Sequence, residues 1–520
     1  MKGFEINMKI NISKKVCAIA ASIILLSSTA ASACTGFYVG KEVSSDGSVM
    51  IARTEDMVSS NSKRFIVHPA ADHEDGEVYK DAHGLTVEYP KHTYRYTATP
   101  GSATRGIGDT PFGAAGFNEL GVAATSTITA YPSKKAIAVD PFVENGLYEL
   151  SANDIILSRA TSARHGIEII ADIIDKYGSG EGNIIMTADE NEAWYMEIYT
   201  GHQYAAIKLP DNMAAVIPNA YMLGEIDVNS PDVIVSENLV SLAEKHRFLN
   251  RTNGKINLRK TYAEDKKDSN TIRIWGGQRL LHGKVNKNPY DTEYVLLFEP
   301  TEKISVKDVM DASRTRYEGT NYSLDIPANK YIRSISTSRQ EECHILQIRP
   351  DMPKEMACIQ WLCLSNAEFA PYLPYYATAI SDTPSVCKLD APDYNEKSMY
   401  WASRSLNTLC AQNRELYGNK IKEFYNQYEN NLIEYVSIMD KKMQSSPAKI
   451  KTATDLCFDI TYDAYGKSRN LFGQLIKFIA AYEGADEFEN NKLEFEINLD
   501  TDVKEVSSHI SSPNTIVTSN

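Results

Sequence analysis

Cys34 directly follows three small residues, Ala31-Ser32-Ala33, and this arrangement is the first candidate for chemistry in the chain. Signal peptidase inspects small residues at these positions, so we expect cleavage after Ala33, which would make Cys34 the first residue. A free N-terminal cysteine carries a thiol with a pKa of about 8.5 and an α-amine with a pKa of roughly 7.7–8.0. The amine can therefore accept the proton of the thiol, and one residue supplies both nucleophile and general base.

The position of Cys34 is also compatible with two roles outside catalysis. A lipoprotein signal places a cysteine directly after the cut and then acylates its thiol and its amine. Such signals usually carry Leu or another branched residue three positions before the cysteine, where this chain has Ala31. The residue could also be a buried or disulfide-bonded thiol that happens to lie near the cut, because a lone motif is a weak indication.

Residues 1–33 have the pattern of an export signal. Lys14 and Lys15 form a basic region, and an apolar run follows from Val16 to Leu26. This run is shorter than the roughly 20 residues that a membrane-spanning helix needs, and we expect no such span in the mature chain. The signal is also complete if translation begins at Met8. The pattern predicts export, to the periplasm or the extracellular space, after cleavage following Ala33.

Composition excludes several classes of protein. The chain has 520 residues, of which 43% are hydrophobic and 23% charged, as in an ordinary globular protein. Its net charge is −14, and the part after residue 33 carries −17, because residues 1–33 hold four lysines and one glutamate. A chain this acidic repels phosphate backbones, so nucleic acid is not expected as a partner. No zinc-binding motif is present, and we predict neither a metal nor an organic cofactor.

The hydrophobic pattern predicts an α+β fold. A short strand at 35–40, a turn at 44–47 and a second strand at 48–53 form a hairpin, with Cys34 at its start and Arg53 at the far end. Two helices follow, one capped by Ser151 and one that stops at Gly178. Turns at 189–191 and 210–212 predict antiparallel hairpins among strands at 183–187, 193–199, 204–209 and 214–217. Six cysteines lie beyond residue 340, an even number that makes some disulfides plausible in an exported chain.

Several spaced motifs resemble one family of enzymes. Together they are similar to the bacterial secreted cysteine dipeptidases of the dipeptidase A type, relatives of penicillin V acylase and bile salt hydrolase, over roughly 34–380. The motifs are CTGFYVG (34–40), DGS (46–48), ARTED (52–56), NELGVA (118–123), AWYMEIYTGH (193–202), PNAYMLGEID (218–227), RYEGT (316–320) and IRPDMP (348–353).

The resemblance implies a fold and a set of residue roles. The fold is the four-layer αββα sandwich of N-terminal-nucleophile hydrolases, and the substrates are dipeptides. Cys34 would attack the carbonyl, Arg53 would stabilise its thiolate, and Asp56 would orient the α-amine. Asn219 would hold the amine or the oxyanion, and Arg273 matches a second active-site arginine, although Arg279 is close enough to compete. The acylase relatives carry an asparagine on the strand after Gly121, but here that stretch is 123–127 and contains none, so no substitute is assigned.

Plainer interpretations of the same residues also exist. Arg53 and Asp56 could form a surface ion pair, and Asn219, which follows a proline, could start a turn. His344 lies in an apolar strand and is expected to be a hydrogen-bonded core residue. An acylase of bile-salt or penicillin type, and a non-catalytic lipoprotein anchored at Cys34, are the alternative functions.

The predicted organisation has four parts. A signal at 1–33 precedes the peptidase domain at 34–400, a helical C-terminal extension at 401–490 and a loose tail at 491–520. A homo-oligomer is one possible assembly, and composition does not decide it.

Overall fold

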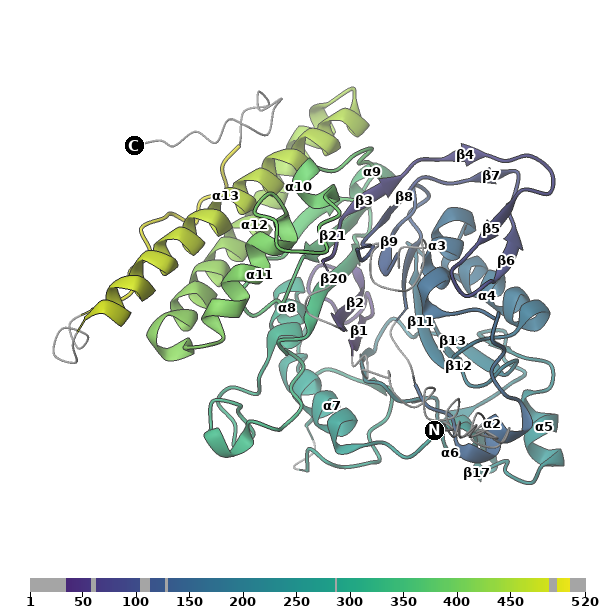
Figure 1. Cartoon of the computed structure of the whole chain (residues 1–520). Helices are drawn as coiled ribbons and strands as arrows, with labels where there is room; N and C mark the ends of the chain where they lie inside the picture. Colours follow the sequence, from purple (N-terminus) through teal and green to yellow (C-terminus); the bar gives the residue numbers. More distant parts are fainter. Residues whose placement is uncertain are drawn as a thin grey trace, which may run out of the picture.

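The computed structural model describes residues 34–57, 62–102, 113–126, 130–285, 288–485 and 493–505. Within these ranges helices and antiparallel sheets are mixed, which confirms the predicted α+β class (Figure 1). The predicted signal at 1–33 lies outside the described residues. No helix in the described part of the chain is both long and apolar enough to cross a bilayer.

The first sheet carries Cys34 immediately before one of its interior strands. Its order is β19-β14-β1-β2-β20-β21-β22, and all neighbours are antiparallel. The β1–β2 hairpin is the one predicted from the turn at 44–47. The strands are β1 (Thr35–Val39), β2 (Val49–Asp56), β14 (Ala214–Ile217), β19 (Leu297–Phe298), β20 (Gln340–Ile348), β21 (Cys358–Cys363) and β22 (Leu373–Tyr376).

The second sheet has the order β16-β13-β12-β11-β10-β9 and is also antiparallel. The predicted hairpin across the turn at 210–212 is wrong, because β14 leaves this sheet and pairs with β1 in the first one. All four residues of β14 are buried, so it suits an interior position better than an edge. The strands are β9 (Ala115–Phe117), β10 (Ala123–Ser126), β11 (Asn183–Ala188), β12 (Ala193–Ile198), β13 (Tyr204–Lys208) and β16 (Val233–Val235).

The two sheets share an apolar core between their inner faces. Along β1 and β2 successive side chains point to opposite faces, so Tyr38 and Ile51 contribute to this core while Phe37 and Met50 enter another. Ile184 and Met186 of β11 contribute from the second sheet. Both faces of β1 are therefore covered by packed side chains, which hold the backbone next to Cys34 in place.

Two helices cover the outer face of the second sheet. These are α3 (Glu149–Arg159) and α4 (Ala163–Tyr177), and they share a core with β11 and β12. As predicted, α4 ends at Gly178, whose φ is +79°. The predicted cap at Ser151 is wrong, because α3 already begins at Glu149 and the Ser151 hydroxyl donates to Asp81 Oδ2 at 2.6 Å.

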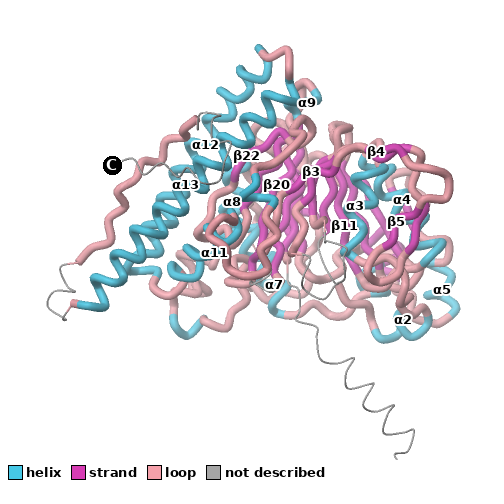
Figure 2. Tube along the Cα trace, turned by 45° about the horizontal axis from the view of Figure 1, so that its top comes forward, coloured by secondary structure: helices cyan, strands magenta, loops and turns pink. Residues whose placement is uncertain are grey.

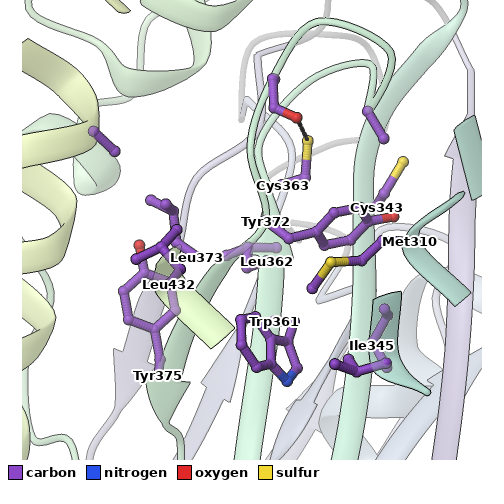
Figure 3. Close-up of a cluster of buried hydrophobic side chains, with 14 of the residues drawn as sticks. Met310, Cys343, Ile345, Trp361, Leu362, Cys363, Tyr372, Leu373, Tyr375 and Leu432 are labelled. Carbon is purple, nitrogen blue, oxygen red and sulfur yellow. Dashed lines mark hydrogen bonds between the residues drawn. The ribbon is translucent and has the colours of Figure 1, made fainter. Parts of the chain in front are cut away.

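The C-terminal helices cover the outer face of the first sheet. They are α11 (Met399–Cys410), α12 (Asn419–Ser445) and α13 (Lys449–Gly484), and they lie beside α8 (Val306–Arg314) (Figure 2). Their apolar residues join those of β20, β21 and β22 in one continuous core. Figure 3 shows part of this core, where Leu432 of α12 lies near Leu373 and Tyr375 of β22. The segment predicted as an extension thus packs directly on the sheet that carries Cys34.

Part of the predicted tail packs on these helices. Phe495 is buried, and Ile497, Leu499 and Val503 lie against the same core. Asn431 of α12 donates to the carbonyl oxygen of Thr501 at 2.8 Å. Residues 493–505 are therefore held against α12 and α13, whereas residues 506–520 lie outside the described part.

Smaller elements complete the described structure. Three two-stranded sheets pair β3 with β8, β4 with β7 and β5 with β6, and a three-stranded sheet has the order β15-β18-β17. The strands are β3 (Ile66–His68), β4 (Ala71–Asp72), β5 (Val78–Lys80), β6 (Thr86–Glu88), β7 (His92–Thr93), β8 (Tyr96–Ala98), β15 (Glu225–Ile226), β17 (Arg251–Thr252) and β18 (Lys255–Asn257). The helices are α2 (Lys134–Val139), α5 (Leu239–Lys245), α6 (Leu258–Tyr262), α7 (Asp268–Leu280), α9 (Lys354–Ala357), α10 (Ser385–Lys388), η1 (Pro327–Asn329) and η2 (Arg414–Gly418).

None of the seven cysteines in the described ranges forms a disulfide, and all seven are buried. Cys343 and Cys363 lie opposite each other on β20 and β21, and burial raises the pKa of both thiols. The disulfides considered from the even number of late cysteines are thus not present in this structure.

Candidate active site

The β1–β2 hairpin brings Cys34 close to Asp56. Thr35 pairs with Thr54 and Gly36 with Arg53, so the residue before β1 meets the end of β2. The backbone N–H of Asp56 donates to Cys34 Sγ at 3.4 Å. Cys34 is fully buried, which raises the pKa of its thiol to about 12, and the charge of Arg53 opposes this rise. Burial alone therefore keeps this thiol protonated at neutral pH.

Arg53 lies in a buried network of charges. Its guanidinium contacts Glu55 at 2.5 Å and Glu149 at 2.9 Å, and it also donates to the carbonyl oxygen of Ser126. Lys63 contacts the other oxygen of Glu55 at 2.8 Å. Burial disfavours the charged form of Arg53, but Glu55 and the neighbouring acids outweigh burial and raise its pKa. Arg53 is thus a permanent buried cation, and the interpretation as a surface ion pair is wrong.

Asp56 faces the other side of Cys34 and pairs with Arg333. Arg333 Nη2 donates to Asp56 Oδ2. Oδ1 of the same carboxylate is buried and has no hydrogen-bond partner among the described residues. Burial raises the pKa of Asp56, opposed by Arg333, Arg273 and Arg339. A buried acceptor without a donor costs free energy of folding. This oxygen can therefore accept a hydrogen bond from a donor that is formed or bound only after the chain has folded.

Arg273 of α7 holds the backbone of Cys34. Its Nη1 donates to the carbonyl oxygen of Cys34 and to Thr35 Oγ1 at 3.1 Å, and its Nη2 donates to Asn219 Oδ1 at 2.9 Å. Arg279 lies six residues further along the helix, which turns it about 120° away. It contacts the carbonyl oxygen of Glu318 at 3.4 Å instead. Of the two arginines that the sequence pattern allows, Arg273 is the one that touches Cys34.

Asn219 follows β14 and is fixed by α7 at two points. Asn270 Nδ2 donates to its backbone oxygen at 2.7 Å, and Arg273 donates to its side-chain oxygen. This second contact orients the amide, so Nδ2 is the end that can donate to a ligand. The other four predicted residues, two on the neighbouring strand and two from more distant segments, therefore lie near Cys34.

A cavity of about 250 Å³ opens in front of this group. Its walls come from four segments of the chain: a residue just before α2, the residues after β14, the stretch from residue 264 into α7, and the segment before β20. The lining residues are Tyr131, Asn219, Ala220, Glu264, Asp265, Lys267, Ser269, Asn270, Arg273, Arg333 and Arg339. Cys34 is fully buried and is not among these residues, but Arg273, which contacts its carbonyl oxygen, is one of them. A thiol with amide and guanidinium donors near it has the groups needed to attack a carbonyl carbon and stabilise the resulting oxyanion.

Sequence reasoning missed Glu55, Lys63, Glu149 and Arg333. Glu55 was visible between Arg53 and Asp56, but the other three lie on segments without a recognisable motif. His344 was correctly expected in the core: it contacts Glu342 at 2.8 Å and Thr125 Oγ1 at 3.0 Å. No cluster of potential metal ligands occurs in the described ranges.

Comparison with known proteins identifies the class. The model of peptidase family C69 matches residues 33–427, and the chain belongs to this family. The match runs past residue 400 into α12, so it includes part of the predicted extension.

Two relatives and one solved structure are similar to this chain. A probable dipeptidase B of Streptococcus pyogenes serotype M1 is 37% identical over 406 residues, covering 75% of this chain and 80% of the relative. A probable dipeptidase of Latilactobacillus sakei is 33% identical over 460 residues, covering 86% and 95%. A mutant conjugated bile acid hydrolase from Clostridium perfringens matches as a structure with a TM-score of 0.27 and 10% identity, covering 66% of this chain and 91% of that one.

Proposed function

We propose that this chain is an exported cysteine dipeptidase whose nucleophile is Cys34, after cleavage behind Ala33. The observation that carries this proposal is the surroundings of Cys34: the N–H of Asp56 contacts its sulfur, and Arg273, which lines a cavity, contacts its carbonyl oxygen. Membership of peptidase family C69 and relatives described as probable dipeptidases support peptide bonds as the target.

The reaction begins with a proton transfer within Cys34. The α-amine accepts the proton of Sγ, and the thiolate attacks the scissile carbonyl carbon to form an S–C bond and an oxyanion. Asn219 Nδ2 donates to the oxyanion. When the C–N bond breaks, the proton held by the amine passes to the leaving nitrogen. Water then attacks the thioester, gives a proton to the amine, and restores the thiol as the amino acid leaves.

Two buried groups support this cycle. Asp56 Oδ1, which has no partner within the described ranges, accepts a hydrogen bond from the new α-ammonium and orients it toward the sulfur. Arg53 lowers the pKa of the thiol through its charge, against the effect of burial. While residue 33 is attached, the nitrogen of Cys34 is a peptide nitrogen and accepts no proton, so export activates the enzyme.

The fold proposed for this machinery is the αββα sandwich of N-terminal-nucleophile hydrolases. The two sheets packed face to face, with α3 and α4 on one outer face and α8 and α11 to α13 on the other, support it. In this arrangement the C-terminal helices form the outer layer of the catalytic domain.

The test compares three forms of the protein: one that begins at Cys34, its Cys34→Ser variant, and one that retains a methionine before Cys34. We expect hydrolysis of dipeptides only by the first form, with losses of at least roughly a thousandfold for the others, because each lacks the thiol or the basic amine. Equal activity with the retained methionine would refute the proposed general base.

Mass spectrometry of the exported protein distinguishes the peptidase from a lipoprotein. An unmodified amine on Cys34 supports the peptidase, and a diacylglyceryl adduct identifies the lipoprotein. A panel of dipeptides and conjugated bile salts, assayed with and without EDTA, distinguishes a peptidase from an acylase. Activity lost in EDTA and restored by zinc would overturn the metal-free mechanism.

A further inference from the structure

Tyr317 has an unusual backbone conformation in the turn that follows α8. Its φ is +64°, in the left-handed region that a residue with a bulky side chain rarely adopts. The residue is nevertheless fully buried, and its backbone N–H donates to Thr315 Oγ1 at 2.9 Å. Strain of this kind persists only where the surrounding contacts hold it, and it occurs most often at functional sites. The contacts of Tyr317 therefore indicate what it does.

The side chain of Tyr317 lies between α7 and the segment before β20. Its ring packs so closely on α7 that a Cβ on Gly276 would lie 2.2 Å from it. Its hydroxyl donates to the backbone oxygen of Arg333 at 2.8 Å. Gly276 lies three residues after Arg273, on the same face of the helix. Tyr317 therefore joins the helix that contacts Cys34 to the segment that carries Arg333.

Arg333 connects Tyr317 to the surroundings of the nucleophile. Its guanidinium donates to Asp56 Oδ2 and to the carbonyl oxygen of Ser334. The backbone N–H of Asp56 in turn donates to Cys34 Sγ at 3.4 Å. The Tyr317 hydroxyl thus holds the backbone of the residue whose side chain holds the Asp56 carboxylate.

The neighbouring Glu318 joins the strained turn to α12. Its Oε2 accepts hydrogen bonds from the backbone N–H of Arg316 at 2.9 Å and from Thr315 Oγ1 at 3.2 Å. Its Oε1 contacts Lys422 Nζ of α12 at 2.6 Å. Burial disfavours the charged form of Glu318, but Lys422 and the hydrogen bonds outweigh burial and lower its pKa. The turn is therefore closed by a carboxylate that α12 keeps ionised.

Lys422 is one of three charged residues on the same face of α12 that form ion pairs with other elements. Glu429 contacts Arg314 of α8 at 2.6 Å, and Asp440 contacts Arg349, directly after β20, at 2.7 Å. These two residues follow Lys422 by seven and eighteen positions, close to two and exactly five helical turns of 3.6 residues. The row of ion pairs fixes α12 against α8 and β20, and so fixes the place of Lys422.

We propose that Tyr317 is a positioning residue that acts on Asp56 through Arg333. On the other side of the same turn, the ion pair between Glu318 and Lys422 of α12 supports it. The proposal rests on the proposed function, in which the Asp56 carboxylate orients the α-amine of the nucleophile. It also gives the C-terminal helices a part in the active site, because α12 holds the turn that carries Tyr317.

Tyr317→Phe, in the protein that begins at Cys34, removes only the hydroxyl and keeps the ring on α7. We expect kcat for Ala-Leu to fall about fivefold to thirtyfold, because the Asp56 carboxylate is held less firmly. KM should stay within about threefold, since Tyr317 is not among the residues that line the cavity.

The pH profile of the same variant reports on Asp56 itself. Burial raises the pKa of Asp56, and the charges of Arg333, Arg273 and Arg339 oppose this rise. A loosened Arg333 opposes it less, so the carboxylate takes up its proton at a higher pH. The acid limb of kcat/KM should therefore move to higher pH by at least about half a unit.

Tyr465→Phe is the matched control. Its hydroxyl on α13 donates to the carbonyl oxygen of Glu396 at 2.5 Å, so it loses the same kind of hydrogen bond. Denaturant unfolding in a Cys34→Ala background compares the loss of stability in the two variants. The proposal requires that only Tyr317→Phe changes kcat and the acid limb. If Tyr317→Phe left both unchanged, the proposal would be overturned, whatever its loss of stability.

Lys422→Met tests the contribution of α12 and leaves the buried tyrosine intact. We expect kcat to fall about twofold to fivefold, with a shift of the acid limb in the same direction. Lys420→Met, at an exposed lysine of the same helix that lies 4.0 Å from Glu494, is the control and should change neither. No effect of Lys422→Met, or an equal effect of Lys420→Met, would overturn the part proposed for α12.

Alkylation of Cys34 by iodoacetamide, located by mass spectrometry, follows the thiolate without any substrate. The acid limb of its rate should move to higher pH in Tyr317→Phe, as that of kcat/KM does. If the unsubstituted protein hydrolyses no dipeptide, the proposed function fails. The alkylation profile then still decides the positioning role, because an unchanged profile in Tyr317→Phe would overturn it.

Discussion

Two groups of charged residues lie near Cys34, one around Arg53 and one along the cavity. They differ in how many of their charges are paired within the group. Behind β2, Arg53 and Lys63 are completely buried, and each has a carboxylate within 2.8 Å, supplied by Glu55. In front, Arg273, Arg333 and Arg339 line a cavity where acidic residues are fewer. The charges of the first region are paired with each other inside the protein, whereas the arginines of the second region line a cavity.

This difference separates a structural role from a binding role. Buried charges are tolerated only when they are paired, so removing one member of the region behind β2 should cost stability. An exposed arginine at the cavity, such as Arg339, contributes less to the fold, so removing it should cost little stability. Stability and affinity measurements on single variants can therefore separate the two roles.

The largest effect is expected for Arg53→Met. It leaves Glu55 and Glu149 without their shared buried cation, and we expect a loss of about 3–5 kcal/mol in the free energy of unfolding. Denaturant unfolding of the Cys34→Ala protein measures this without turnover. Arg251→Met is the matched control and should stay within about 0.5 kcal/mol. A similarly small loss for Arg53→Met would remove the distinction between the regions.

The titration of Glu149 is expected to have a smaller effect on the free energy of unfolding for each pH unit. Burial raises the pKa of Glu149 from 4.5 to about 8, opposed by Arg53. Between these values the folded state binds more protons than the unfolded state, so the contribution of Glu149 to stability falls as pH rises and is constant above about pH 8. The slope is at most about 1.4 kcal/mol per pH unit. Glu149→Gln should remove this pH-dependent contribution to stability. It is measured by unfolding the proteins with and without this substitution from pH 5 to 9 and comparing the two series. If the two unfolding series ran parallel across this pH range, the raised pKa of Glu149 would be contradicted.

The smallest effect on stability is expected for Arg339→Gln. Arg339 is exposed, and its Nε donates to the carbonyl oxygen of Met57 at 3.2 Å. We expect a change within about 0.5 kcal/mol in the free energy of unfolding. A stability loss comparable to that of Arg53→Met would mean that the cavity arginines also serve the fold.

Local patterns made part of the site predictable. The turn at 44–47 sets the β1–β2 register, and this register places Arg53 and Asp56 near Cys34. Strand alternation and the helix stop at Gly178 were likewise readable, because they depend on neighbouring residues. The crossing of β14 into the first sheet was not readable, because the turn at 210–212 is compatible with a hairpin, and only the competition between possible partner strands decides it.

The order of residues along the chain was enough to predict that Cys34 follows a cleavable segment and that a cation and a carboxylate return to it on the next strand. The packed fold was needed to establish that Arg273 and not Arg279 reaches Cys34, and that Arg333 joins Asp56 from 277 residues away. The contacts within the β1–β2 hairpin join residues close in sequence, and their register is set by a few adjacent residues. The contacts of Arg273 and Arg333 join residues far apart in sequence. Which distant cation meets a buried carboxylate depends on how all the sheets and helices pack, and no local pattern records that.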